Sequence, residues 1–219
     1  MYVQIPTKIM RCADFKFWLP KHVKGGLKAL VVLTPGSNGD GRGMVDDKVW
    51  QEFAEKNKFG LVGCFFQDKQ PTAIEGYARA SEESGGALLW AIRAFSNHVK
   101  EVELEHIPLL LWGFSAGGQF NYEMNAAFPD RVGAFVVNKG GIYYTALCSE
   151  RARRNPGLFF IGKKDAPWRQ AIVKGLVQLN GIGGANWSLI EEDCGHGEKD
   201  SEAISQAWFE KVLRESLRA

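Results

Sequence analysis

The sequence lacks any apolar run that approaches the roughly 18 residues needed to cross a bilayer, and its start lacks the charged-then-apolar layout of a signal peptide. We therefore expect no membrane partner. The compartment is left open, because a signal peptide that has been removed leaves no trace. The sequence also lacks a large excess of charge of one sign, because 27 Lys and Arg are balanced by 25 Asp and Glu. A net charge of +2 gives no reason to expect a nucleic acid partner. The short basic run at 151–154 is interpreted as a solvated helix end.

Cysteine is sparse and scattered along the chain. Cys12, Cys64, Cys148 and Cys194 include no C-x-x-C pair, so neither a zinc site nor a thioredoxin-like motif is predicted. We expect no metal and no cofactor. Cys64 lies in the apolar run LVGCFF and is interpreted as a buried thiol, whereas a disulfide at Cys194 is left open.

Internal repeats and low-complexity linkers are also absent, so nothing in the sequence marks a domain boundary. With 219 residues, 45% of them hydrophobic and 24% charged, the chain can bury a large core without help from metals or disulfides. We predict a single domain over residues 1–219.

Short apolar runs alternate with longer stretches of helical period, which is typical of a parallel sheet with helices on both faces. The first strand alternates apolar and polar residues and is interpreted as an antiparallel edge. The fold class predicted is α/β, a doubly wound and mostly parallel sheet that binds ligands at the carboxyl ends of its strands. Strands are predicted over 15–19, 28–33, 60–66, 107–112, 132–138, 157–162 and 186–192. Helices are predicted from Asp46 or Asp47 through Ala54, from a Ser84 cap through Phe95, and over 116–127, 167–179 and 201–217.

A serine lies between two glycines where a buried strand is predicted to end. The stretch LLLWGFSAGGQF (109–120) carries the pentapeptide G-x-S-x-G around Ser115. This pentapeptide is weak evidence alone, but between a strand and a helix it predicts a sharp turn that exposes Ser115 above the sheet. A Cβ at Gly113 or Gly117 would clash with neighbouring backbone in such a turn. We interpret Ser115 as a nucleophile, and a serine helix cap at a glycine-rich strand end is the alternative.

A serine hydroxyl needs a base within hydrogen-bond reach, and the sequence has only four histidines. His22 precedes a strand, His98 ends a helix, and His106 lies at the amino end of the serine's own strand. None of these is well placed to reach the carboxyl edge. His196 follows the last strand in a glycine-flanked loop, so it is the predicted base for Ser115.

The imidazole needs a carboxylate that fixes its tautomer and stabilises its positive charge. Asp165 lies just past the penultimate strand and is the predicted acid, with a helix cap as its alternative role. Glu192 and Asp193 are rivals by proximity in sequence, but a residue so few positions before His196 is poorly placed to orient its ring.

An oxyanion formed at the substrate needs two preorganised N–H donors. The backbone of Ala116, directly after the serine, is the first predicted donor. The second is predicted in the glycine-rich loop TPGSNGDGRG (34–43), at Ser37 with Asn38 as the next choice. The loop lacks G-K-[ST] and the G-x-G-x-x-G spacing, so it does not indicate a phosphate site.

The order of Ser115, Asp165 and His196, each after a predicted strand, resembles the α/β-hydrolase superfamily from FKFWLP to WFEKVL. Within it, LTPGSNGDG, WQEFAEKNKFGLVGCFF and GFSAGGQFNYEMNAAFPDRVGAFVV resemble poly(3-hydroxybutyrate) depolymerase-like and feruloyl-type esterases. Pro35 departs from this branch, in which many members carry His there, and so leaves the second oxyanion donor open. About twenty residues separate the strands near 138 and 157, too few for a large lid domain.

The resemblance implies a serine carboxylester hydrolase that forms an acyl-enzyme with a small-molecule ester, either aromatic (feruloyl-like) or short-chain. Phe114, Tyr143, Tyr144 and Trp168 are aromatic residues that could line its pocket. The alternatives are a non-catalytic binding protein of this fold, an acyltransferase, a peptidase or a dienelactone-type hydrolase, the last of which would carry Cys at position 115. The oligomeric state is not predicted.

Overall fold

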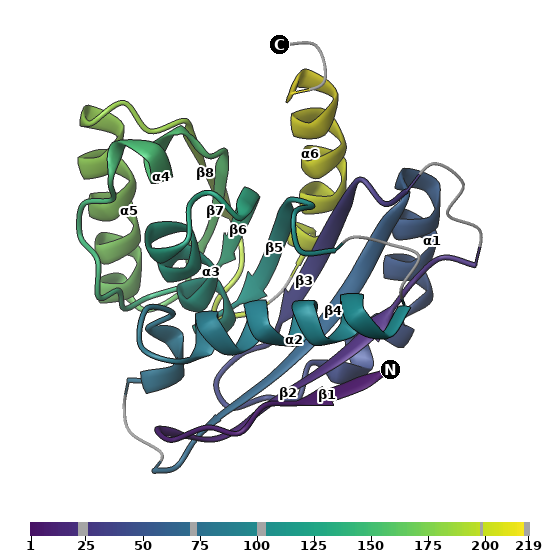
Figure 1. Ribbon diagram of the computed structural model, residues 1–219. Helices are drawn as coiled ribbons and strands as arrows, with labels where there is room; N and C mark the ends of the chain where they lie inside the picture. Colours follow the sequence, from purple (N-terminus) through teal and green to yellow (C-terminus); the bar gives the residue numbers. More distant parts are fainter. Residues whose placement is uncertain (22–25, 71–73, 100–103, 198, 217–219) are drawn as a thin grey trace.

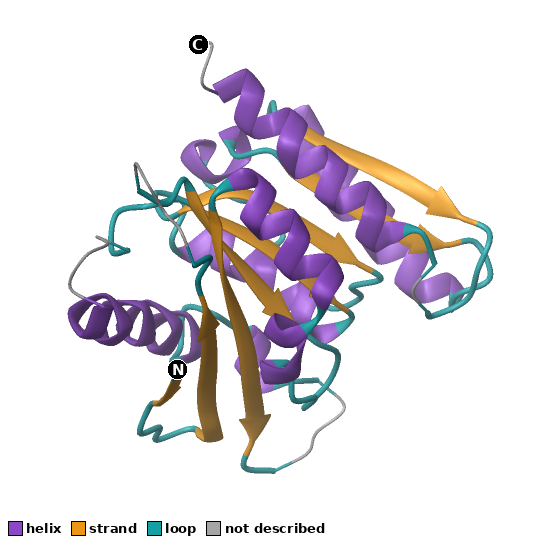
Figure 2. Cartoon of the chain, turned by 90° about the vertical axis from the view of Figure 1, so that its right-hand side faces the viewer, coloured by secondary structure: helices purple, strands orange, loops and turns teal. Residues whose placement is uncertain are grey.

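The computed structural model describes residues 1–21, 26–70, 74–99, 104–197 and 199–216. These residues form a single-domain α/β fold around an eight-stranded sheet of order β1-β2-β4-β3-β5-β6-β7-β8, with helices on both faces (Figures 1 and 2). The strands are β1 (Tyr2–Gln4), β2 (Met10–Trp18), β3 (Ala29–Thr34), β4 (Phe59–Asp68), β5 (Leu109–Phe114), β6 (Val132–Asn138), β7 (Gly157–Gly162) and β8 (Trp187–Glu192). The helices are η1 (Arg42–Asp46), α1 (Lys48–Asn57), η2 (Gly76–Ala78), α2 (Ser84–Val99), α3 (Ala116–Ala127), α4 (Glu150–Arg154), α5 (Pro167–Ile182) and α6 (Ser201–Ser216).

Alternate residues of the central strands enter two apolar layers, one on each face of the sheet. In β3, Leu30 and Val32 pack with residues of α2, α3 and α5, whereas Val31 and Leu33 pack with residues of α1 and α6. Side chains alternate across a strand, so a strand covered on both faces must be apolar at nearly every position. This explains the unbroken apolar runs of the sequence and confirms the doubly wound sheet.

The parallel register brings the carboxyl ends of six strands, β3 to β8, to one edge of the sheet. Thr34 of β3 pairs with Gly113 of β5, and Phe114 pairs with Asn138 of β6. At the far side, the last residues of β7 and β8, Gly162 and Glu192, are paired. The loops that follow these strands therefore meet above one edge.

The first predicted strand is antiparallel, as expected, but its interpretation as the edge of the sheet is wrong. β2 lies between β4 and the short β1, in which Val3 pairs with Phe15. Val3 and Ile5 reach the apolar layer beneath α2, which anchors β1 although it is too short to show a periodic pattern. The strand predicted over 107–112 begins instead at Leu109 and continues to Phe114, directly before the serine.

Two predicted helix starts have different outcomes. Asp47 caps α1, because its side chain accepts a hydrogen bond from the N–H of Val49 at 2.7 Å. Ser84 is not a cap: it is the first residue of α2, and its hydroxyl donates to the carbonyl of Tyr77 at 2.6 Å. The helix predicted over 201–217 is α6, and position 217 lies outside the described residues.

The basic run at 151–154 lies in the short helix α4, where its guanidinium groups bind within the chain. Arg153 donates to the carbonyl of Gly183 at 2.7 Å, and Arg151 pairs with Asp130 at 2.8 Å. α4 belongs to the 139–156 connection between β6 and β7, which adds no lid domain to the described residues.

All four cysteines carry free thiols, so the disulfide left open at Cys194 is not formed. Cys64 is fully buried as predicted, and this burial raises the pKa of its thiol to about 12. Among the described residues, no helix is both long and apolar enough to cross a membrane, and no cluster of three or more His, Cys, Asp and Glu side chains could hold a metal ion.

Candidate active site

Ser115 lies on a sharp turn between β5 and α3, with φ 52° and ψ −119°. A residue other than glycine rarely adopts positive φ, and such strain costs on the order of 1–3 kcal/mol. The turn is held by two backbone hydrogen bonds. The N–H of Ser115 donates to the carbonyl of Asn138 at 2.8 Å, and the carbonyl of Ser115 accepts from Gln119 at 3.1 Å.

Two glycines make this turn possible, as the sequence predicts. A Cβ at Gly117 would lie 2.1 Å from the carbonyl oxygen of Thr34, and one at Gly113 would lie 2.4 Å from the carbonyl oxygen of Gly117. Both distances are far inside van der Waals contact, and the atoms met are backbone atoms that cannot move aside. The helix therefore packs against β3 and β5 only if both side chains are absent.

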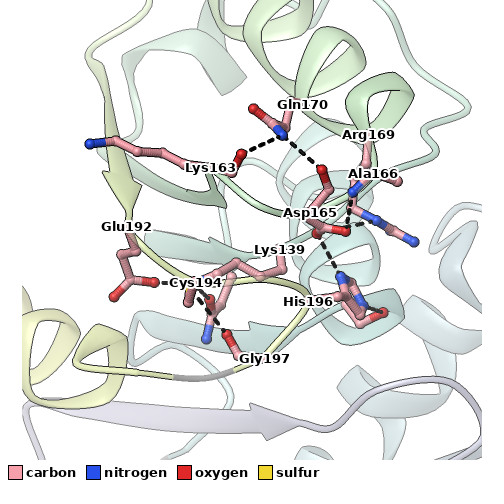
Figure 3. A network of polar contacts seen from close by, with 12 residues as sticks. Lys139, Lys163, Asp165, Ala166, Arg169, Gln170, Glu192, Cys194, His196 and Gly197 are labelled. Atoms are coloured by element: carbon pink, nitrogen blue, oxygen red, sulfur yellow. Dashed lines mark hydrogen bonds and ion pairs between the residues drawn. The ribbon is translucent and has the colours of Figure 1, made fainter.

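The structure brings the three predicted triad residues into one hydrogen-bonded chain. The Nε2 atom of His196 lies 3.0 Å from the hydroxyl of Ser115, and its Nδ1 atom lies 2.8 Å from Oδ2 of Asp165. The second contact is visible in Figure 3. The imidazole is one-third exposed, whereas the carboxylate is only 6% exposed. A partly open imidazole between a hydroxyl and a buried carboxylate can accept a proton from one side and be oriented from the other.

The surroundings of Asp165 stabilise its negative charge. Its Oδ1 atom accepts a hydrogen bond from the N–H of Ala166 at 2.7 Å, at the amino end of α5 where the helix dipole is positive. The Nε atom of Arg169 lies 3.5 Å from Oδ2, close enough for an ion pair although it makes no hydrogen bond. The same guanidinium lies over the ring of Trp168.

Neither rival carboxylate contacts His196. Glu192 is buried and pairs with Lys139. Asp193 lies at the surface 3.0 Å from Lys164, and hydrogen bonding to that ammonium lowers the pKa of the carboxyl. Both carboxylates are therefore engaged with a lysine, and Asp165 is the carboxylate on the ring.

The two other histidines that the structure describes do not approach the serine. His98 is exposed in the last turn of α2, and His106 is exposed before the amino end of β5, opposite the edge that carries Ser115. His22 lies outside the described residues.

The loop after β3 passes directly beside the serine. A Cβ at Gly36 would lie 3.7 Å from the Cβ of Ser115. Among the described residues, the backbone N–H groups of Ser37 and Ala116 have no acceptor, whereas the N–H of Asn38 donates to the hydroxyl of Tyr77 at 3.2 Å. The two donors that the sequence favours are thus free, whereas Asn38, the next choice, is already committed.

Asn38 and its neighbours hold this loop in shape. The Asn38 backbone has φ 50°, and its side-chain oxygen accepts from the N–H of Asp68 at 2.9 Å. The Asp68 carboxylate in turn accepts from the N–H groups of Gly76 and Tyr77, and burial raises its pKa. Burial also raises the pKa of the Tyr77 phenol, which therefore stays protonated beside Asn38.

The aromatic residues predicted for the pocket lie in different surroundings. Phe114 places its ring 5.3 Å from the imidazole of His196. Trp168 is 48% exposed at the start of α5, and Tyr144 is 42% exposed. Tyr143 instead packs its ring 4.9 Å from Tyr122, with its hydroxyl buried and unpartnered among the described residues, and burial raises its pKa.

Lys139 and Arg169 are polar neighbours of the triad that sequence reasoning missed. Lys139 directly follows the apolar run of β6 in VVNKG. Its position at the end of a buried strand was the only feature of the sequence that could have pointed to it. Arg169 lies four residues after Asp165, a helical spacing that brings the two side chains to one face of α5.

No protein-family model matches the chain, and no curated protein matches it. Solved structures do. A structure of esterase PE8 is 17% identical with a TM-score of 0.64, over 90% of this chain and 99% of that one. LpqC, a poly(3-hydroxybutyrate) depolymerase from Bordetella parapertussis, is 18% identical with a TM-score of 0.62, over 93% and 88% of the two chains.

Poly(aspartic acid) hydrolase-1 from Sphingomonas sp. KT-1 is 14% identical with a TM-score of 0.66, over 94% of this chain and 97% of that one. These likenesses extend over nearly the whole of both chains. Together with the strand order, they establish that the chain has the α/β-hydrolase fold.

Proposed function

We propose that the protein is a serine hydrolase that cleaves carboxylic esters, with Ser115 as nucleophile, His196 as general base and Asp165 as the orienting acid. The observation that carries the proposal is the imidazole of His196, whose two nitrogens lie 3.0 Å from the serine hydroxyl and 2.8 Å from the carboxylate. A second support is the strained backbone of Ser115, because strain of this kind concentrates at functional sites.

In the first half of the reaction, Ser115 Oγ attacks the carbonyl carbon of the ester while His196 Nε2 accepts the hydroxyl proton. The proton on Nδ1 stays on the ring and donates to Asp165, which stabilises the imidazolium. The carbon–oxygen bond of the ester then breaks, and the alcohol leaves with the proton that His196 returns. Water repeats these steps on the acyl-enzyme and releases the acid.

The tetrahedral intermediate carries a negative oxygen in each half of the reaction. Ala116 follows the serine and Ser37 lies in the loop that passes beside it, and neither N–H group has an acceptor among the described residues, so we assign them as the oxyanion donors. Each such donor is worth about 10²- to 10³-fold in kcat.

The substrates that we propose are small esters with an aromatic or short-chain acyl group. Phe114 lies against the imidazole and Trp168 is exposed in the first turn of α5, so both can contact a planar acyl group. Tyr143 stays a weaker candidate because its hydroxyl is buried. The connection between β6 and β7 holds only α4 in the described chain, which favours a site without a lid.

Amide hydrolysis is a second candidate, favoured by the likeness to the structure named poly(aspartic acid) hydrolase-1. The same imidazole that protonates an alcohol can protonate an amine. A panel of matched ester and amide substrates separates the two, since the ester proposal expects the amide of each pair to stay uncleaved.

The test uses p-nitrophenyl esters of increasing acyl length, hydroxycinnamate esters and a fluorophosphonate probe. The wild type should hydrolyse the esters and be labelled, whereas Ser115→Ala should lose about 10⁴-fold or more in kcat and all labelling. Ser81→Ala, at an exposed turn, is the matched control and should behave as the wild type. Full activity in Ser115→Ala would overturn the proposal, and a folded wild type that is neither active nor labelled would favour a non-catalytic binding protein.

A further inference from the structure

A buried ion pair lies at the carboxyl edge of the sheet, beside the triad but outside it. The Nζ atom of Lys139 contacts Oε2 of Glu192, with the two side chains 0% and 6% exposed. The same Nζ donates to Oδ1 of Asn138 at 3.0 Å. Figure 3 shows the lysine extending from the end of β6 to the glutamate at the end of β8.

This arrangement lowers the stability of the folded state in three ways. Both charges lose their hydration, and an apolar pair of similar volume is often at least as stable. Lys139 has φ 57°, which is unfavourable for a residue with a side chain. In the described part of the chain, Oε1 of Glu192 also has no hydrogen-bond partner. Stability alone therefore does not account for the pair.

On one side, the pair is attached to the serine turn. The backbone carbonyl of Asn138 accepts a hydrogen bond from the N–H of Ser115, and its side-chain oxygen accepts one from the Lys139 ammonium. The side-chain amide of Asn138 donates to the hydroxyl of Ser201 at 2.7 Å. The N–H of Lys139 also donates to the carbonyl of Phe160 in β7 at 3.0 Å. A shift of Lys139 would therefore move Asn138, whose carbonyl holds the backbone of Ser115.

On the other side, the pair is attached to both loops that carry the acid and the base. The backbone carbonyl of Glu192 accepts hydrogen bonds from the backbone N–H of Lys163 at 2.8 Å and from that of Cys194 at 2.9 Å. Lys163 begins the loop that leads to Asp165, and Cys194 lies in the loop that leads to His196. The backbone N–H of Lys164 also donates to the carbonyl of Cys194 at 2.9 Å, and this hydrogen bond joins the two loops.

We propose that Lys139 and Glu192 are positioning residues, whose ion pair fixes the serine turn relative to the two loops and thereby sets the contacts of His196. The inference rests on the proposed function, since the pair acts through that triad. Neither residue touches the substrate, so loss of the pair lowers kcat and leaves KM nearly unchanged.

The experiment compares Lys139→Met and Glu192→Met with the double variant that carries both. Each single variant leaves one buried charge unpaired and should lose both melting temperature and activity. The double variant has no buried charge, so its melting temperature should return close to that of the wild type. Its kcat should stay about 10-fold or more below the wild type, because a displacement of about 1 Å in a catalytic group can cost 10²-fold.

A matched control lies one residue away on β8. Glu191 pairs with Lys174 of α5 at 2.9 Å, and both side chains are about 40% exposed. The double variant Lys174→Met/Glu191→Met should keep the wild-type kcat, because this pair does not join the serine turn to the loops.

A readout that needs no turnover is the low-field proton resonance of the His196–Asp165 hydrogen bond. It should shift or broaden in the Lys139→Met/Glu192→Met variant and stay unchanged in the control. If that variant does not fold, Glu192→Asp serves instead, since it keeps both charges and shortens the link by one methylene group; a lower kcat at constant KM is expected.

A refolded double variant with wild-type kcat and an unchanged resonance would overturn the inference, as would a wild-type kcat in Glu192→Asp. An inactive, unlabelled wild type would instead refute the proposed function. In that case the resonance alone decides on the positioning role.

Discussion

The serine side of the site and the acid–histidine side are built by different means. Ser115 lies in one tight turn, held by backbone hydrogen bonds and by glycines whose replacement would drive a Cβ into neighbouring backbone. Asp165 and His196 lie on two loops, 31 residues apart from each other, and the imidazole is one-third exposed. The first side is fixed by local strain, and the second depends on contacts between distant segments.

This difference indicates which of the three side chains are displaced most easily by substitutions. The turn cannot relax without disturbing the packing of α3 on β3 and β5, so we expect its geometry to persist in most variants. The two loops share one anchor at the carbonyl of Glu192, so we expect a small change there to move Asp165 and His196 together.

The largest effect that separates the two sides should come from Asp165→Asn. An amide at this position favours the wrong tautomer of His196, so kcat should fall about 10⁴-fold while the fold is retained. The measurement is kcat on a p-nitrophenyl ester, with unfolding followed by circular dichroism. Asp193→Asn, on the exposed rival, is the matched control, and an equal loss there would mean that the acid is misassigned.

A smaller effect should come from the loop that flanks the serine side. Ser37→Pro removes the proposed oxyanion donor and should lower kcat about 10²- to 10³-fold. Ser37→Ala keeps the N–H and should stay within a few-fold of the wild type. If the proline variant keeps both its fold and its kcat, the second donor lies elsewhere in the loop.

The smallest effect concerns the strain at the turn itself. Glycine tolerates the backbone angles of Ser115, so Ser115→Gly should unfold with a free energy about 1 kcal/mol higher than Ser115→Ala, although both are inactive. Urea denaturation of the two variants measures the difference. Equal stabilities would show that the turn stores no strain.

The sequence predicted the serine side well, for a physical reason. The glycines around Ser115 act on backbone within a few residues or in adjacent parallel strands, so their spacing, together with the strand before and the helix after, predicts the turn. The parallel sheet followed from apolar runs buried on both faces. His196 and Asp165 were reached through topology and elimination, and their distances to one another depend on packing that no local pattern contains.

The buried pair shows what the sequence could not predict. A lysine after a strand usually marks a solvated loop, and Glu192 was weighed only as a rival acid. Their contact joins residues 53 positions apart through the end of a sheet, and it follows from the strand order rather than from either local pattern. Strand β1 was missed for a related reason, because its pairing depends on β2 and not on its own three residues.

The order of the triad along the chain has a consequence for biosynthesis. Ser115 is translated well before β7 and β8, which are followed by the acid and the base proposed for it. On the proposed mechanism, a nascent chain that has made the serine turn therefore carries an unactivated alcohol, which should be inert toward acyl compounds and toward covalent inhibitors. If the proposed triad is correct, chemical reactivity arrives only after β7 and β8 have been made, and probe labelling then reports on the folding of both strands.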